Sequence, residues 1–266
     1  MTDSLTVLGT RGSIPLSGPD YTAYGCATTS FLAVLNDTPI LLDGGSGLMN
    51  VPEEILEKPQ LTLLLSHLHL DHIIGLSMFP YLFRKDANLT VYYPDYYGSE
   101  TDMWHERLFS PPLWPVGLNG LSANVTCGPL PDSFTVGNVR IETEDGEHPG
   151  GVKVIRLMTE TRKIIFATDC TLTDEVIRRL TGFAYNCDLL LTDGQFFPEE
   201  WEGHEASGHN TCAAAANFGN LCHAKKVRII HHSPWHTDEM MDKETARLEK
   251  IHPDCSFARE GEIITF

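Results

Sequence analysis

Short runs of hydrophobic residues, separated by Gly, Pro and Asn, dominate the first part of the chain. The runs at residues 5–8, 30–35 and 39–43 have the length and the boundaries of β-strands. Similar runs follow further along the sequence and are predicted as strands as well: 61–65, 89–93, 139–143, 152–157 and 163–167. This part of the chain therefore predicts β-sheet structure.

From about residue 173 the pattern changes to an alternation of helical and extended periodicity. Helical spacing of hydrophobic residues occurs at 173–180, 211–218 and 238–251, and apolar strand-like runs lie between them at 188–191 and 227–230. Strands and helices that alternate in this way pack as a sheet covered by helices.

The stretch 84–131 is the least regular part of the chain. It holds many aromatic residues among several prolines, including Phe109 and Trp114. Connections of this length are often functional loops, so we interpret the stretch as a lid or insert that covers a site, with Trp114 as a substrate contact. The alternative is that these rings only pack the loop onto the sheet.

Composition narrows the range of functions. A chain of 266 residues with 42% hydrophobic content can bury a full core, and we expect a single domain over 1–266. The net charge of −17 disfavours a long nucleic acid as a partner. Seven cysteines without paired spacing, no signal segment and no membrane-spanning run favour a cytoplasmic protein without a membrane partner. A homodimer is compatible with this sequence.

Candidate chemistry is concentrated in Ser-His-Leu-His-Leu-Asp-His at 66–72, directly after the apolar run 61–65. These side chains converge only if the backbone leaves a strand, turns tightly and enters a helix. His67 and His69 then lie on one side of the turn, while Asp71 and His72 fall in the first helical turn and point the other way. Imidazole and carboxylate suit zinc-type ions, so the loop predicts ligands for two adjacent metals. The alternative is a polar loop with surface histidines.

The pattern His-x-His-x-Asp-His resembles the signature of the metallo-β-lactamase superfamily of hydrolases. The resemblance implies an α/β fold, a four-layer αββα sandwich with metals at one edge between its two sheets. It also implies further ligands at strand ends in a fixed order, and His148, Asp169 and His231 fill these positions.

The family's ligand set implies two sites, one of His67, His69 and His148 and one of Asp71, His72 and His231, with Asp169 as a bridge. Two divalent ions about 3.5 to 4 Å apart can hold a hydroxide between them as the nucleophile. Zinc or manganese is the expected metal, and iron is an alternative. Asp43 matches the family's carboxylate that orients a ligand histidine, although a turn or helix-cap Asp is the other interpretation.

Residues 188–195 and Gly208-His209 before a helix resemble the branch of ribonuclease Z and related phosphodiesterases. His209 then corresponds to that branch's proton-relay histidine, a general acid; the alternative is a histidine at a capped helix start. Two departures from ribonuclease Z stand out. Asp193 replaces a Glu that partners the relay histidine, and no long basic arm for transfer RNA is present. The chain looks closer to small phosphodiesterases, including the phosphoribosyl cyclic phosphate diesterase.

We therefore predict a dinuclear metal-dependent hydrolase, with His209 and Asp71 in catalysis, acting on a small, cyclic or linear phosphodiester. Hydrolysis of a carbon ester, lactone or β-lactam is the main alternative. A di-iron redox protein is disfavoured because His69 is retained where that branch has Glu, and a non-catalytic module because no ligand is missing. His236, in His-His-Ser-Pro-Trp-His at 231–236, is a candidate phosphate contact or a surface histidine, and the role of His232 stays open.

Overall fold

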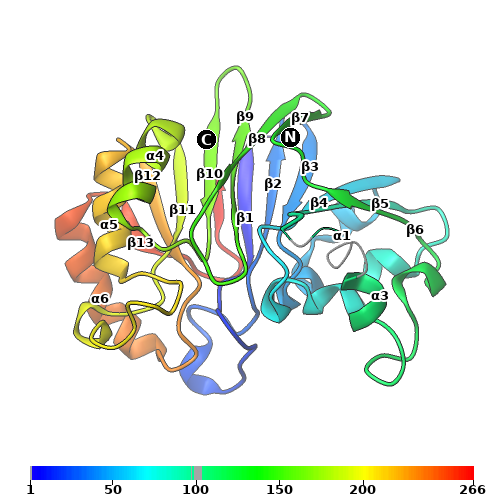
Figure 1. Ribbon diagram of the computed structural model, residues 1–266, viewed down its shortest axis with the longest axis horizontal. Coiled ribbons are helices and arrows are strands. Elements are labelled where there is room, and N and C mark those ends of the chain that lie inside the picture. The colour runs from blue at the N-terminus through cyan, green and yellow to red at the C-terminus, as the bar shows by residue number, and fades with distance from the viewer. Residues whose placement is uncertain (1, 97, 99–103) are drawn as a thin grey trace.

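Two seven-stranded sheets pack face to face and carry helices on their outer sides (Figure 1). The structure, a computed structural model, describes residues 2–96, 98 and 104–266. The layered arrangement confirms the predicted αββα sandwich.

The first sheet combines the two ends of the chain with most of its first half. Its strands are antiparallel from β14 to β3 and parallel from β3 to β6. In spatial order they are β14 (Ile263–Thr265), β1 (Ser4–Gly9), β2 (Ser30–Leu35), β3 (Thr38–Leu42), β4 (Gln60–Leu64), β5 (Asn88–Tyr93) and β6 (Asn124–Pro129).

The second sheet is built from the rest of the chain. Its strands are parallel from β13 to β10 and antiparallel from β10 to β7. In spatial order they are β13 (Cys255–Phe257), β12 (Lys226–Ile230), β11 (Leu189–Asp193), β10 (Lys163–Ala167), β9 (Lys153–Met158), β8 (Val139–Asp145) and β7 (Ser133–Val136).

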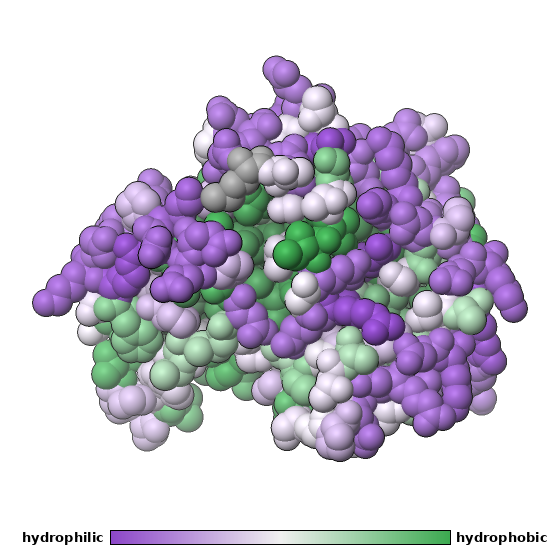
Figure 2. All heavy atoms as spheres, turned by 180° about the vertical axis from the view of Figure 1, so that it is seen from behind, coloured by the Kyte–Doolittle hydropathy of each residue, from purple (hydrophilic) through white to green (hydrophobic). Residues whose placement is uncertain are grey.

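Three hydrophobic clusters hold these layers together. One fills the space between the sheets, and it explains why strands such as β2 are buried along their whole length. A second lies under α4 (Asp174–Ala184), α5 (Cys212–Leu221) and α6 (Asp238–Ile251), which cover the second sheet. Viewed from behind, hydrophobic side chains also gather near the middle of the surface, between hydrophilic flanks (Figure 2).

The layer over the first sheet differs from a row of long helices. It consists of α1 (Glu53–Leu56), α3 (Trp104–Leu108) and short 3-10 turns, packed on the third cluster. The segment after the His67 loop was expected to be helical. It forms two 3-10 turns instead, Leu70–His72 and Ile74–Met78, and backbone hydrogen bonds from Gly44 to His72 and from Gly75 to Gly44 hold them against the loop after β3.

The insert 84–131 contains more regular structure than its sequence suggested. Its described residues include α3 and all of β5, and they add β6 to the edge of the first sheet. Residues 97 and 99–103 of the insert lie outside the described residues. Its role as a lid stays a prediction.

None of the seven cysteines, all of which lie in described residues, forms a disulfide. Among the helices of the described residues, none combines the length and the hydrophobicity that a membrane crossing requires.

Candidate metal centre

The strands deliver the candidate ligands to one end of the sandwich. His67 follows β4, Asp169 follows β10 and His231 follows β12, each within three residues of the strand end. The backbones of Asp43, Asp169 and His231 have φ angles of 56°, 48° and 60°. Non-glycine residues adopt this left-handed conformation at a cost of about 1 to 3 kcal/mol each and concentrate at functional sites. The surrounding strands therefore hold these side chains in strained, fixed positions.

Four predicted ligands form the first half of the centre. His67, His69, His148 and Asp169 each offer a ligand atom, and these atoms lie within 4.8 Å of one another. His69 Nδ1 is 3.1 Å from His148 Nε2. Asp169 Oδ2 is 3.7 Å from His67 Nε2 and 3.8 Å from His148 Nε2.

The second half contains Asp71, His72 and His231, whose ligand atoms also lie within 4.8 Å of one another. Asp71 Oδ2 is 3.3 Å from His72 Nε2 and 3.2 Å from His231 Nε2. Asp169 reaches this half too, since its oxygens are 3.3 Å from His72 Nε2 and 3.1 Å from His231 Nε2. Asp169 thus lies between the two halves, and the structure brings all seven predicted ligands together.

Outer contacts fix the orientation of the imidazoles. Asp43 is fully buried, and its Oδ2 is 2.6 Å from His72 Nδ1. His148 Nδ1 lies 2.9 Å from the carbonyl oxygen of Gly208, and His231 Nδ1 lies 2.9 Å from Gln195 Oε1. An acceptor on one ring nitrogen places the hydrogen there and leaves the other nitrogen free to bind a metal.

Burial and neighbouring charges shift the pKa values of the titratable groups in opposite directions. Burial lowers the pKa of His67 well below its usual range, so this imidazole is neutral and ready to act as a ligand. Burial also disfavours a charged His72, yet Asp169, Asp71 and Asp43 outweigh it and raise the pKa of His72 well above its usual value. The buried carboxylates therefore stabilise positive charge at the centre.

These features fit divalent metals. Within the described residues, His67 Nε2 and His72 Nε2 are buried and have no hydrogen-bond partner, which is unusual for polar atoms. Imidazole nitrogens and carboxylate oxygens are the ligands of zinc and similar ions. Two dications would use both orphan nitrogens and neutralise the carboxylates.

His209 lies beside the second half of the centre. It contacts Asp193, the carboxylate that stands where ribonuclease Z has the Glu partner. Its Nδ1 is 2.8 Å from Asp193 Oδ2, and its ring stacks on His231 with centroids 4.8 Å apart. Burial disfavours the charged imidazole, but Asp193 outweighs it and raises the pKa of His209 to about 9. His209 also groups with Asp169, Asp193 and His231 as candidate ligand atoms. Thr211 caps α5, so the helix-start interpretation of this segment holds as well.

Neither of the two predicted substrate contacts belongs to the clustered candidate ligands. The ring of His236 is buried, stacks on Phe197 with centroids 3.7 Å apart, and has its Nε2 2.8 Å from Glu200 Oε2. It is therefore not a surface histidine. Trp114 is half-buried against the hydrophobic cluster over the first sheet. Substrate-binding roles for these two residues stay predictions.

Two residues near the amino terminus belong to the centre but were missed in the sequence. The backbone N–H of Ser13 donates to Asp71 Oδ2 at 2.7 Å. A Cβ on Gly12 would lie 2.3 Å from the His231 ring, so only glycine fits there. Neither residue offers a ligand side chain, and only the tight turn after β1 could have drawn attention to them.

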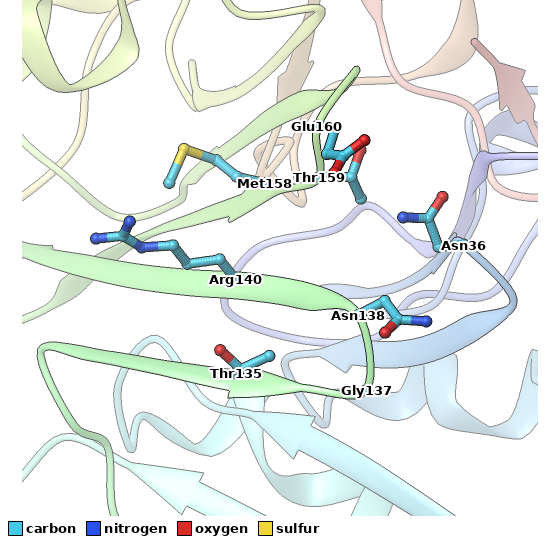
Figure 3. Close-up of a pocket in the computed structure, with 8 residues that line it drawn as sticks. All are labelled: Asn36, Thr135, Gly137, Asn138, Arg140, Met158, Thr159 and Glu160. Atoms are coloured by element: carbon cyan, nitrogen blue, oxygen red, sulfur yellow. The ribbon is translucent and has the colours of Figure 1, made fainter.

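A separate hollow of about 740 Å³ lies at the opposite end of the sandwich (Figure 3). The backbone N–H of Asn36, one of its lining residues, bonds to Asp3 just before β1, whereas the metal centre lies beyond the end of β1. The hollow is lined by Asn36, Thr135, Gly137, Asn138, Arg140, Met158, Thr159 and Glu160. None of the predicted site residues is among them.

Comparison with known families identifies the fold. The family described as "Beta-lactamase superfamily domain" matches residues 39–232, more than half of the chain. The chain belongs to the metallo-β-lactamase superfamily. Among curated relatives, ribonuclease Z of Treponema denticola is 25% identical over 137 residues, which are 52% of this chain and 43% of that protein. The match thus spans less than half the length of that relative. Ribonuclease Z of Natronomonas pharaonis is 23% identical over 85% of this chain and 86% of its own.

Solved structures of the superfamily share the whole fold at low identity. The metallo-β-lactamase fold protein YhfI from Bacillus subtilis has a TM-score of 0.75 at 20% identity and covers 99% of both chains. A diphosphatase from the PhnP family has a TM-score of 0.73 at 17% identity and covers 99% of this chain and 98% of its own. These structures share the fold of this chain, and the family match adds that it is a member of the metallo-β-lactamase superfamily with a buried His/Asp cluster.

Proposed function

We propose that this protein is a dinuclear metal-dependent phosphodiesterase that hydrolyses a small phosphodiester. The observation that carries the proposal is the position of Asp169, whose oxygens lie between two clusters of imidazoles, with His209 directly beside the second cluster. The names of two relatives, a ribonuclease Z and a PhnP-family diphosphatase, indicate hydrolysis of phosphorus esters or anhydrides. They support a phosphorus ester over a carbon ester as the substrate.

The seven clustered residues would hold two ions of zinc or manganese. Such a pair lowers the pKa of a water nucleophile and neutralises charge on the phosphate oxygens. His67 and His69 with His148 would hold the first ion.

The chain's own residues orient the ligand imidazoles and protonate the leaving group. Asp43 keeps the hydrogen of His72 on Nδ1 through its 2.6 Å contact, and Gly208 does the same for His148. His209 is held by Asp193 and gives its Nε2 proton to the oxygen that leaves the phosphorus. Asp193 stabilises the protonated ring and raises the pKa of His209, which favours the acid form.

The test is hydrolysis of bis(p-nitrophenyl) phosphate by protein loaded with zinc or manganese, in the same panel as a lactone and a β-lactam. We expect turnover of the phosphodiester that a chelator abolishes. A lactone hydrolysed far faster than any phosphodiester would instead establish the carbon-ester alternative.

His209→Ala separates the acid from the metal ligands. We expect the variant to keep both metals and to lose about 10²- to 10⁴-fold in turnover of an alkyl diester, the range for a positioned acid. The loss should be smaller for a nitrophenolate leaving group, which needs little protonation. His204→Ala is the control, since His204 lies in the same loop but packs on Phe196. Loss of a metal, or equal losses for both leaving groups, would contradict the role.

A further inference from the structure

The chain segments that carry the metal centre contain a single cationic side chain, Arg11. No other Lys or Arg occurs in these segments, all of which the structure describes: 10–14, 43–46, 66–72, 145–151, 169–173, 193–210 and 231–238. Proteins that capture polyanions use lysine and arginine side chains for the phosphates. The composition of these segments is therefore unusual for a site that would bind a highly charged substrate.

Arg11 is already engaged by the protein. Its side chain is fully buried, and its Nε donates to the carbonyl oxygen of Gly25 at 2.7 Å. Its Nη1 donates to the carbonyl oxygens of His236 at 2.9 Å and Ser233 at 3.2 Å. The guanidinium thus ties together two loops and is not exposed to a substrate. The loop 196–208 that leads to His209 carries the exposed residues Glu202 and Glu205 and contains no Lys or Arg.

Exposed apolar side chains occupy the same segments. Ile14 is 54% exposed, Leu70 is 55% exposed and Trp235 is 81% exposed, which are high values for large hydrophobic residues. Ile14 follows Ser13 in the sequence, and Leu70 precedes Asp71. The hydrogen bond from Ser13 N to Asp71 Oδ2 therefore brings the backbones of Ile14 and Leu70 close together. These two side chains therefore start from adjacent points beside the second half of the centre.

Trp235 belongs to the same part of the surface. The backbone N–H of Gly12 donates to the carbonyl oxygen of His232 at 3.0 Å, and that of His232 donates to Thr10 at 2.9 Å. The loop 231–238 thus runs alongside the segment that carries Ile14. We call Ile14, Leu70 and Trp235 the apolar rim.

We infer that the apolar rim binds an uncharged, hydrophobic group of the substrate. The preferred substrate is then a phosphodiester whose reacting phosphate carries its only negative charge. Burial of an aromatic or alkyl group against the rim contributes hydrophobic free energy, and the acidic loop repels any further anionic group. This inference rests on the proposed function for the reacting group, but it concerns the part of the ester that does not react.

Binding to the zinc-loaded protein tests the rim without requiring turnover. Calorimetry would compare three diesters: dimethyl phosphate, diphenyl phosphate and bis(4-carboxyphenyl) phosphate. We expect diphenyl phosphate to bind at least about tenfold more tightly than dimethyl phosphate, the effect of burying part of one ring. The added carboxylates of the third diester should reverse most of that gain.

Variants assign the preference to named residues. Trp235→Ala and Ile14→Ala should each reduce the preference for diphenyl over dimethyl phosphate. Glu202→Lys should reduce the penalty for the carboxylated diester. Ile263→Ala is the control, because Ile263 is 64% exposed but lies in β14, which pairs with the start of β1.

Equal binding of dimethyl and diphenyl phosphate, or a preference that both rim variants retain, would overturn the inference. If diphenyl phosphate binds with the expected preference and no diester is hydrolysed, the rim inference holds and the proposed phosphodiesterase activity fails. The two failures are therefore distinguishable.

Discussion

Replacement of Asp43 by Asn is expected to weaken metal binding while leaving the fold intact. The Asp43 carboxylate accepts from Ser66 N at 2.6 Å and Ser66 Oγ at 2.8 Å, and lies 2.6 Å from His72 Nδ1. A carboxylate only accepts, so the hydrogen of His72 sits on Nδ1 and Nε2 is left for a metal. The amide of Asn places donors where one carboxylate oxygen was, and His72 must then move its hydrogen to Nε2.

The magnitude follows from which interactions survive. Loss of an orienting partner of a ligand histidine costs about 10- to 100-fold in metal affinity, which corresponds to about 1.4 to 2.8 kcal/mol. The metal-free fold should lose less, because Asn keeps an acceptor for Ser66 and removes a buried charge; burial already raises the pKa of Asp43. Asp43→Ala should instead leave buried donors unpaired and destabilise the fold by about 1 to 3 kcal/mol for each of them.

Zinc titration by calorimetry and urea unfolding in chelator separate these effects. Asp188→Asn is the matched control, because Asp188 is also buried and bonded to Lys163 N and Lys225 Nζ, but lies before β11, away from the metal centre. Asp43→Asn should weaken the half that contains His72 more than the half that contains His67. The reasoning is refuted if Asp43→Asn binds both ions as tightly as the wild type, or if both halves weaken equally.

Three further predictions test the centre as a whole. Asp169→Ala should reduce metal content in both halves, because the Asp169 oxygens contact imidazoles of each half. Metal analysis after desalting measures this. Loss of one ion with full activity would contradict a bridging role. Gly12→Ala should weaken the half containing His231 by about tenfold or more in a metal titration, since its Cβ would meet that ring, whereas Gly128→Ala, with open space around it, should change nothing. Chelation should lower the melting temperature by about 5 to 10 °C if each metal was present at about 100 times its Kd, as measured by circular dichroism, and an unchanged melting temperature would argue against buried ligands.

The strands that could be predicted from sequence are those that line the central core. The run at 30–35 matches β2 and the run at 163–167 matches β10, because both are buried and their hydrophobic residues are continuous. Strands β6, β7, β13 and β14 were missed. They are short or partly exposed, and β14 forms only by pairing with β1 from the other end of the chain.

The candidate site divides in the same way. Side chains with strong ligand chemistry could be read from the sequence, and the structure brings the seven proposed ligands together, although their role in binding metal remains a prediction. Contacts made by the backbone could not be read. Ser13 bonds to Asp71 across 58 positions, and Gly208 meets His148 across 60, through an N–H and a carbonyl group that every residue carries. The sequence offered His236 as a phosphate contact or a surface histidine, but its burial against Phe197 depends on how the loop at 197 folds back and could not be predicted.

Left-handed backbones and buried carboxylates occur together at the metal centre. Ser13, Asp43, Asp169 and His231 all have positive φ angles, and each of them contacts or forms part of the metal centre. Such conformations, together with buried carboxylates, are unfavourable on their own. They persist because the strands that precede Asp43, Asp169 and His231 are fixed by the core between and around the sheets. A rigid frame of this kind holds ligand atoms close together before any ion binds, so metal affinity should depend on the frame as much as on the ligands themselves.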